Sequence, residues 1–217
     1  MSDNFLHKYF LNNPYKPLFK WIHYFDIYER HFERFRGTSP VMIEIGVLEG
    51  GSLAMWKEYF GPGSRIIGID INPECKEHQA DGIDVFIGSQ DDPGTIDAIF
   101  SKYPKIDIVL DDGSHMMKHM ISSFELIYDR IQSNGVYVVE DTHTCYWKEY
   151  GGGLGRKGSF MEFAKQKLDE INAVHTRGAQ PITEFTRSTD YIAFYDSVVV
   201  FERRRQGHRQ ANITKAM

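Results

Sequence analysis

The chain has 217 residues, of which 41% are hydrophobic and 25% are charged, and its formal net charge is −5. This length suits one domain with a full core and is short for two domains. The negative charge argues against the basic surface that nucleic-acid-binding proteins usually carry. No run approaches the roughly 18 consecutive apolar residues of a membrane helix. We therefore expect neither nucleic acid nor a membrane as a partner.

The two cysteines, Cys75 and Cys145, are too few for a disulfide framework, and the N-terminus lacks the apolar stretch of a signal peptide. We expect a cytoplasmic protein with one domain over residues 1–217. Its parts are a helical N-terminal cap at 1–37, a core at 38–205 and a tail at 206–217. A basic cluster near the C-terminus is expected to be solvated; it contains Arg203, Arg204, Arg205, Arg209 and Lys215. The sequence leaves open whether the chain forms a homo-oligomer.

Residues 5–36 are rich in aromatic side chains, and Phe25, Tyr28, Phe32 and Phe35 recur at helical spacing. This spacing predicts a helix from about residue 20 to residue 35, which would cover one edge of a sheet.

Five apolar runs then alternate with helical segments. The expected strands are 41–45, 65–70, 83–87, 106–110 and 135–140, and the alternation indicates a parallel, doubly wound sheet. After a helix at 160–171, two short apolar runs at 191–194 and 198–201 flank a tight turn, which indicates an antiparallel hairpin. The predicted fold is an α/β, Rossmann-like sheet of seven strands, five of them parallel, with the hairpin at its C-terminal end.

Acidic side chains follow two of the predicted strands. Asp111, Asp112 and His115 end one strand, and Glu140 and Asp141 end the next. Ligands bind at the carboxyl ends of strands in such sheets, and Asp111 and Asp112 must point to opposite faces. Carboxylate oxygens from two strand ends suit Mg²⁺ or a similar ion. With no lysine or arginine nearby, the carboxylates would repel one another unless a cation joined them.

Two alternatives for this cluster stay open at this point. Asp112, His115 and His143 could form the two-histidine, one-carboxylate site of an iron enzyme. The acids could also serve only to cap helices and loops.

The segment Glu44-x-Gly46-x-x-x-Gly50 follows the first predicted strand and differs from the G-x-G-x-x-G dinucleotide pattern. An acid two residues before Gly46 suits an amine-bearing ligand. Asp70 ends the second strand, where it could accept hydrogen bonds from ribose hydroxyls or cap a helix. Together these features indicate S-adenosylmethionine.

The glycine-rich stretch 151–159 lacks the lysine of a phosphate-binding loop, and we interpret it as a mobile lid.

These motifs resemble those of the class I S-adenosylmethionine-dependent methyltransferases. More narrowly, they resemble the metal-dependent O-methyltransferases of macrolide sugars, the group of macrocin and mycinamicin O-methyltransferases, cephalosporin hydroxylases and rhamnosyl O-methyltransferases. The resembling segments are 24–37, 44–52, 111–115 and 140–147, and the similarity runs from about residue 20 to residue 203.

The resemblance implies metal ligands at Asp112, Glu140 and Asp141 and a general base at His115, since an imidazole titrates near neutral pH. The implied cofactor contacts are Glu44, Gly46, Ser52, Asp70, Gly88, Ser89, Gln90, Asp91 and Asp111.

The implied reaction is transfer of a methyl group from S-adenosylmethionine to a hydroxyl of a sugar or glycosylated natural product, with Mg²⁺ or another divalent cation. An NAD(P)-dependent oxidoreductase and an iron-dependent hydroxylase are the alternatives for the same site. A binding module without catalysis would leave the acidic clusters unexplained.

Overall fold

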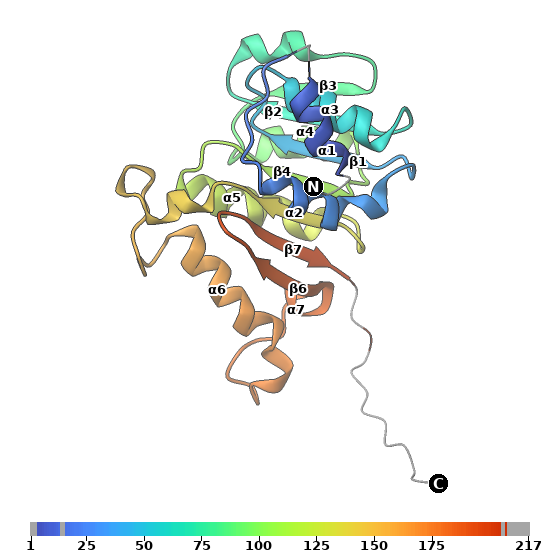
Figure 1. Ribbon diagram of the computed structural model, residues 1–217. Helices are drawn as coiled ribbons and strands as arrows, with labels where there is room; N and C mark the ends of the chain where they lie inside the picture. The colour runs from blue at the N-terminus through green and yellow to red at the C-terminus, as the bar shows by residue number, and fades with distance from the viewer. Residues whose placement is uncertain (1–3, 14–15, 205–206, 208–217) are drawn as a thin grey trace.

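Seven strands form one sheet, with the spatial order β3-β2-β1-β4-β5-β7-β6. The computed structural model (Figure 1) describes residues 4–13, 16–204 and 207. The strands are β1 (Val41–Ile45), β2 (Arg65–Asp70), β3 (Ile83–Ile87), β4 (Ile108–Asp111), β5 (Val136–Val139), β6 (Thr189–Phe194) and β7 (Val199–Arg203). Strands β1 to β5 pair in parallel, and β7 runs antiparallel to both β5 and β6. The predicted fold class is confirmed.

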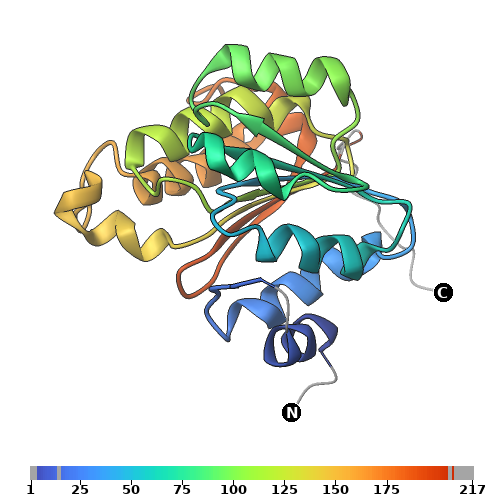
Figure 2. The same cartoon turned by 90° about the horizontal axis from the view of Figure 1, so that it is seen from above.

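Helices cover both faces of the sheet, as Figure 2 shows from above. The α-helices are α1 (Phe5–Asn12), α2 (Tyr24–Phe32), α3 (Gly51–Phe60), α4 (Pro93–Lys102), α5 (Met117–Ile127), α6 (Phe160–Ile171) and α7 (Glu184–Ser188). The short 3-10 helices are η1 (Glu33–Phe35), η2 (Pro73–His78), η3 (Tyr128–Arg130), η4 (Thr142–Tyr146), η5 (Lys148–Tyr150) and η6 (Ala173–His175). No helix in the described part of the chain is long and apolar enough to cross a membrane.

The two faces bury separate apolar cores because the strand side chains alternate between them. One core joins α1, α2 and α3 to the sheet and includes Tyr28, Trp56 and Leu110. The other core lies under α4, α5 and α6 and includes Phe124 and Phe201. A sheet buried on both faces explains why its strands appear in the sequence as nearly continuous apolar runs.

The aromatic N-terminal region differs from the prediction in two ways. Helix α2 begins at Tyr24 rather than near residue 20, and α1 precedes it. The expectation that the aromatic helix covers an edge of the sheet is wrong, because Phe25, Tyr28 and Phe32 pack within the core on one face. Between the two helices, residues 16–21 form a non-helical segment, which we call the strap.

The basic cluster at the C-terminal end is partly buried. Arg203 ends β7, is 7% exposed, and donates from Nη1 to the carbonyl oxygens of Tyr128 (2.6 Å) and Ile131 (2.8 Å). The expectation that it is solvated is therefore wrong for Arg203. Arg205, Arg209, Lys215 and, apart from Gly207, the predicted tail at 206–217 lie outside the described residues.

The sheet topology brings the acidic strand ends together. The chain leaves β1 toward β2 on one side and later adds β4 on the other side, so the order of strands reverses between β1 and β4. Crevices at such reversal points are the usual ligand sites of open α/β sheets. In the register, Ile45 pairs with Asp111 and Asp111 pairs with Val139. Gly46, Asp112 and Glu140 therefore leave three adjacent strands at the same level.

Candidate active site

A pocket of about 600 Å³ opens at this reversal point. Its walls come from the strap, the loop after β1, the end of β2, the turn after β3, the loop after β4 and the end of β5. This volume falls within the range of small-molecule sites, and its position matches the expected ligand edge of the sheet.

The loop after β1 approaches the end of β4 very closely. Gly46 has a φ of +92°, and a Cβ atom there would lie 2.1 Å from the carbonyl oxygen of Asp112. A side chain at this position would therefore collide with the backbone and strain its own. The glycine lets two strand ends form one continuous pocket wall.

Asp70 holds the same loop from the other side. Its Oδ2 accepts from the backbone N–H groups of Val47 (2.9 Å) and Leu48 (3.3 Å), and its Oδ1 accepts from that of Asn72 (2.9 Å). Burial raises the pKa of Asp70, but these backbone donors outweigh burial and leave its pKa below the ordinary value. The cap of the following helix η2 is Asn72 rather than Asp70. A carboxylate charged and fixed in this way is suited to accept further hydrogen bonds in the pocket.

The predicted cofactor contacts fall into two groups. One group lines the pocket: Gly46, Ser52, Asp70, Gly88, Ser89 and Gln90. The other group supports the wall from behind. Glu44 accepts from Ser52 Oγ (2.8 Å) and Trp56 Nε1 (3.2 Å), Asp111 accepts from Ser123 Oγ (2.7 Å), and Asp91 accepts from Ser89 Oγ (2.5 Å). Direct contact with a cofactor stays a prediction for all nine.

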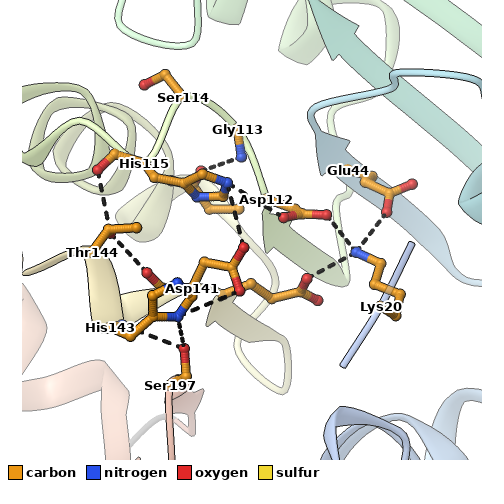
Figure 3. A network of polar contacts seen from close by, with 12 residues as sticks. Lys20, Glu44, Asp112, Gly113, Ser114, His115, Asp141, His143, Thr144 and Ser197 are labelled. Carbon is orange, nitrogen blue, oxygen red and sulfur yellow. Dashed lines mark hydrogen bonds and ion pairs between the residues drawn. The ribbon is translucent and has the colours of Figure 1, made fainter. Parts of the chain in front are cut away.

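On the acidic side of the pocket, His115 faces two carboxylates, as Figure 3 shows. Its Nε2 lies 3.6 Å from Asp141 Oδ2 and 3.9 Å from Asp112 Oδ1. One ligand atom from each of these three residues lies within 4.8 Å of the other two. His115 and Asp141 also have positive φ values, 56° and 50°. Such backbone strain in non-glycine residues is typical of functional sites.

Glu140 points into the buried part of the same cluster. Its side chain is 1% exposed, its Oε2 accepts from Lys20 Nζ (2.8 Å), and its Oε1 accepts from the Tyr28 hydroxyl. The structure thus places Asp112 and Asp141 beside His115, and it places Glu140 beside Lys20. The ligand role of the three carboxylates stays a prediction.

Sequence reasoning missed Lys20, which is the central basic group of this cluster. Its Nζ lies 2.5 Å from Asp112 Oδ2 and 3.7 Å from Glu44 Oε1, in addition to Glu140. The expectation that no basic side chain balances the acids is therefore wrong. Burial lowers the pKa of Lys20, but the three carboxylates raise it well above the ordinary value, so the amine is protonated. Nothing in a lone lysine 92 residues before Asp112 signals this contact.

Tyr24 on α2, which also lines the pocket, connects Asp141 to the hairpin. The Tyr24 hydroxyl donates to Asp141 Oδ1 (2.7 Å) and lies 2.8 Å from Ser197 Oγ, which in turn lies 2.5 Å from His143 Nδ1. His143 is therefore engaged with the hairpin turn. Within the described residues, the group of possible metal ligands comprises Asp112, His115 and Asp141, and His143, which the iron alternative requires, is not in it.

The residues present fit a hard divalent cation. The structure already places one cation, the Lys20 ammonium, against Asp112 and Glu140. Asp112 Oδ1 and Asp141 Oδ2 remain directed toward His115 at the pocket surface. Carboxylate oxygens of this kind are the ligands that Mg²⁺ prefers, together with water or substrate oxygens.

Comparisons with known proteins give a consistent result. No protein-family model matches the chain. It is 32% identical over 202 residues to the 8-demethyl-8-alpha-L-rhamnosyl tetracenomycin-C 2'-O-methyltransferase of Streptomyces olivaceus, covering 87% of this chain and 53% of that protein. It is 39% identical over 144 residues to the demethylmacrocin O-methyltransferase of Streptomyces fradiae, covering 61% of this chain and 36% of that protein.

Among solved structures, the MycE methyltransferase of the mycinamycin biosynthetic pathway, in complex with Mg, SAH and mycinamycin VI, superposes with a TM-score of 0.79. The two are 29% identical, and the match covers 93% of this chain and 53% of MycE. The resemblance to sugar O-methyltransferases is thereby confirmed. The chain spans about half the length of the relatives that it matches, or less.

Proposed function

We propose that the chain is an S-adenosylmethionine-dependent, divalent-metal-dependent O-methyltransferase that acts on a hydroxyl of a sugar or glycosylated natural product. The observation that carries the proposal is a single pocket that joins the Gly46–Ser52 loop to His115, Asp112 and Asp141. The similarity to enzymes that methylate sugars attached to natural products supports both the reaction and the acceptor class.

In this proposal the two ends of the pocket have separate tasks. The wall formed by Gly46, Ser52, Asp70 and the turn at 88–90 binds the methyl donor. S-adenosylmethionine carries its methyl group on a positively charged sulfur, and the neutral thioether left after transfer is a good leaving group. The protein therefore acts mainly by positioning the donor and the acceptor. The acceptor sugar enters over Asp112, Asp141 and His115.

His115 acts as the general base in this arrangement. Its Nε2 lies at the pocket surface, 3.6 Å from Asp141 Oδ2, where it can take the proton of an acceptor hydroxyl. Asp112, Glu140 and Asp141 would hold the divalent cation, which would lower the pKa of the bound hydroxyl. Tyr24 and Ser197 keep Asp141 in place through the hydrogen bonds described above.

The test is a methyl-transfer assay with labelled S-adenosylmethionine, Mg²⁺ and a panel of acceptors that includes demethylmacrocin and mycinamicin VI. We expect methylation of at least one glycoside, and we expect EDTA to abolish it. His115→Ala should lower kcat about 100-fold or more, the range found for removal of a catalytic base. Asp112→Asn should also lower kcat, because the cation loses a charged ligand. Asp97→Asn, an exposed aspartate on α4, is the control and should retain activity.

Each part of the proposal can fail separately. Methylation that survives EDTA would remove the metal from the reaction, and full activity of His115→Ala would remove the base. Turnover that depends on a nicotinamide cofactor or on oxygen and 2-oxoglutarate, without methyl transfer, would favour the alternative enzyme classes. The cytoplasmic location stays a prediction, and so do the absence of nucleic-acid partners and any homo-oligomer.

A further inference from the structure

We propose that Lys20 is a tethered cation that competes with the divalent ion for Asp112 and Glu140. Its ammonium compensates the negative charge of these carboxylates when the ion is absent. It must leave when the ion binds to Asp112, Glu140 and Asp141. This inference rests on the proposed function and adds to it a positioning residue that controls access to the cation site.

The hydrogen bonds of Glu140 are the first reason. Lys20 occupies Oε2 and Tyr28 occupies Oε1, and the side chain is 1% exposed. Both oxygens therefore already accept a hydrogen bond, at the wall of the pocket that Glu140 and Lys20 line. A divalent cation that joins Glu140 to Asp112 would take the position between their oxygens that Lys20 Nζ holds, 2.8 Å from Glu140 Oε2 and 2.5 Å from Asp112 Oδ2.

Charge is the second reason. Lys20 sits among three carboxylates, those of Glu44, Asp112 and Glu140. Removing its ammonium without replacement would leave buried carboxylates uncompensated, which is strongly unfavourable. A divalent ion placed on the same oxygens would in turn repel an ammonium that stayed in contact. Departure of one cation is therefore coupled to arrival of the other.

The strap provides the third reason, because it is anchored at one end. A Cβ atom on Gly51 would lie 2.2 Å from the carbonyl oxygen of Pro17, so the strap passes directly over the start of α3. Lys16 Nζ also lies 3.0 Å from His78 Nδ1. Beyond this anchor, Phe19 and Trp21 are 78% and 49% exposed. Phe19 adds little packing against a movement that withdraws the Lys20 side chain, and this movement must loosen the edge-to-face contact between the Trp21 and His143 rings (6.1 Å between centroids).

The first experiment measures how reactive the Lys20 amine is toward an acetylating reagent, by mass spectrometry, as Mg²⁺ is titrated into the wild-type chain. With no Mg²⁺ we expect slow labelling, because the Lys20 side chain is 3% exposed. Saturating Mg²⁺ should raise the labelling rate of Lys20 about tenfold or more. Without Mg²⁺, the conformation in which Lys20 is withdrawn from the carboxylates is a minor one. Lys165, exposed on α6, is the internal reference and should keep its rate.

The second experiment compares Mg²⁺ affinities by isothermal titration calorimetry. Lys20→Met should bind Mg²⁺ about tenfold or more tightly than wild type, because the fraction of molecules competent to bind rises toward one. Lys165→Met is the control. It removes an exposed lysine on α6 that contacts Glu162 rather than the strap or the carboxylates of the site, and its affinity should equal that of wild type.

Lys20 that stays protected at saturating Mg²⁺ would overturn the proposal, as would equal or weaker binding in Lys20→Met. The labelling experiment needs no variant, so it decides the question even if Lys20→Met fails to fold. Mg²⁺-dependent methylation with Lys20 still protected would refute this inference alone. Release of Lys20 by Mg²⁺ without methylation of any acceptor would refute the proposed reaction alone.

Discussion

At the scale of single residues, Glu44 is the least exposed acidic side chain of the site. It is 0% exposed, and it is held by Ser52, Trp56 and the more distant Lys20. Burial raises its pKa to about 7 from an ordinary value of 4.5, because a low-dielectric environment disfavours the charged form. Its protonation is therefore linked to the stability of the fold.

The sign of that linkage gives a prediction for Glu44→Gln. As pH rises from 4.5, the unfolded chain loses the Glu44 proton first, while the folded chain keeps it until about pH 7. The free energy of unfolding should therefore fall across this window, by up to about 3.5 kcal/mol at 1.4 kcal/mol per pKa unit. Glu44→Gln should lack this fall, which urea unfolding at pH 5, 6, 7 and 8 will measure.

Glu58→Gln on α3, the helix that carries Ser52 and Trp56, is the control for this series. Glu58 is exposed, so its replacement should leave the pH profile of wild type unchanged. A Glu44→Gln profile that parallels wild type between pH 5 and pH 7 would contradict the role of Glu44.

At the scale of elements, the N-terminal helix α2 is fastened to the hairpin through Glu202 on β7. His31 Nδ1 lies 2.7 Å from Glu202 Oε1, and Arg34 donates to both carboxylate oxygens, at 3.0 Å and 2.6 Å. Glu202 is 4% exposed. Burial raises its pKa, but the bonds from His31 and Arg34 outweigh burial and lower it below the ordinary value. His31 Nε2 also lies 3.0 Å from the hydroxyl of Tyr195, in the turn that carries Ser197, which contacts His143.

We predict that Glu202→Gln destabilises the fold by about 2 kcal/mol, the usual cost of losing hydrogen bonds to a charged partner. The lowered pKa means that the contribution of Glu202 is complete above about pH 4.5 and is lost as pH falls through the folded-state pKa. The difference in unfolding free energy between wild type and variant should therefore shrink in acid. Glu162→Gln, which removes the partner of the exposed Lys165, should cost less than about 0.5 kcal/mol.

The elements also mark the limit of what the sequence could predict. Strands β1 to β7 follow from local periodicity, and their order along the chain is enough to place the acidic ends at one edge of the sheet. The contacts of α2 and of the strap are not local. His31 meets Glu202 across 171 residues and Lys20 meets Glu140 across 120. A pattern of apolar spacing carries no information about such pairs, so the balancing lysine was missed.

At the scale of the whole molecule, the topology concentrates negative charge at one end of the sheet. Three adjacent strand ends converge on the pocket, and their acids are balanced within the described chain by one buried ammonium from the strap. A ligand that binds the folded chain and not the unfolded chain stabilises it by mass action. The affinity of the pocket for a divalent ion is thus measurable as stability, independently of turnover.

We predict that Mg²⁺ raises the thermal midpoint of unfolding. At a concentration about 100 times its dissociation constant, the gain is about 2.7 kcal/mol, which corresponds to roughly 5–10 °C for a chain of this size. Differential scanning calorimetry with and without MgCl₂ measures the shift, and NaCl at equal ionic strength controls for screening of the net charge. The double variant Asp112→Asn, Asp141→Asn should show no shift beyond the NaCl value, because both carboxylates that face His115 are then neutral. An equal rise in that variant, or with NaCl alone, would mean that Mg²⁺ acts on the general surface of the protein and not at the strand ends.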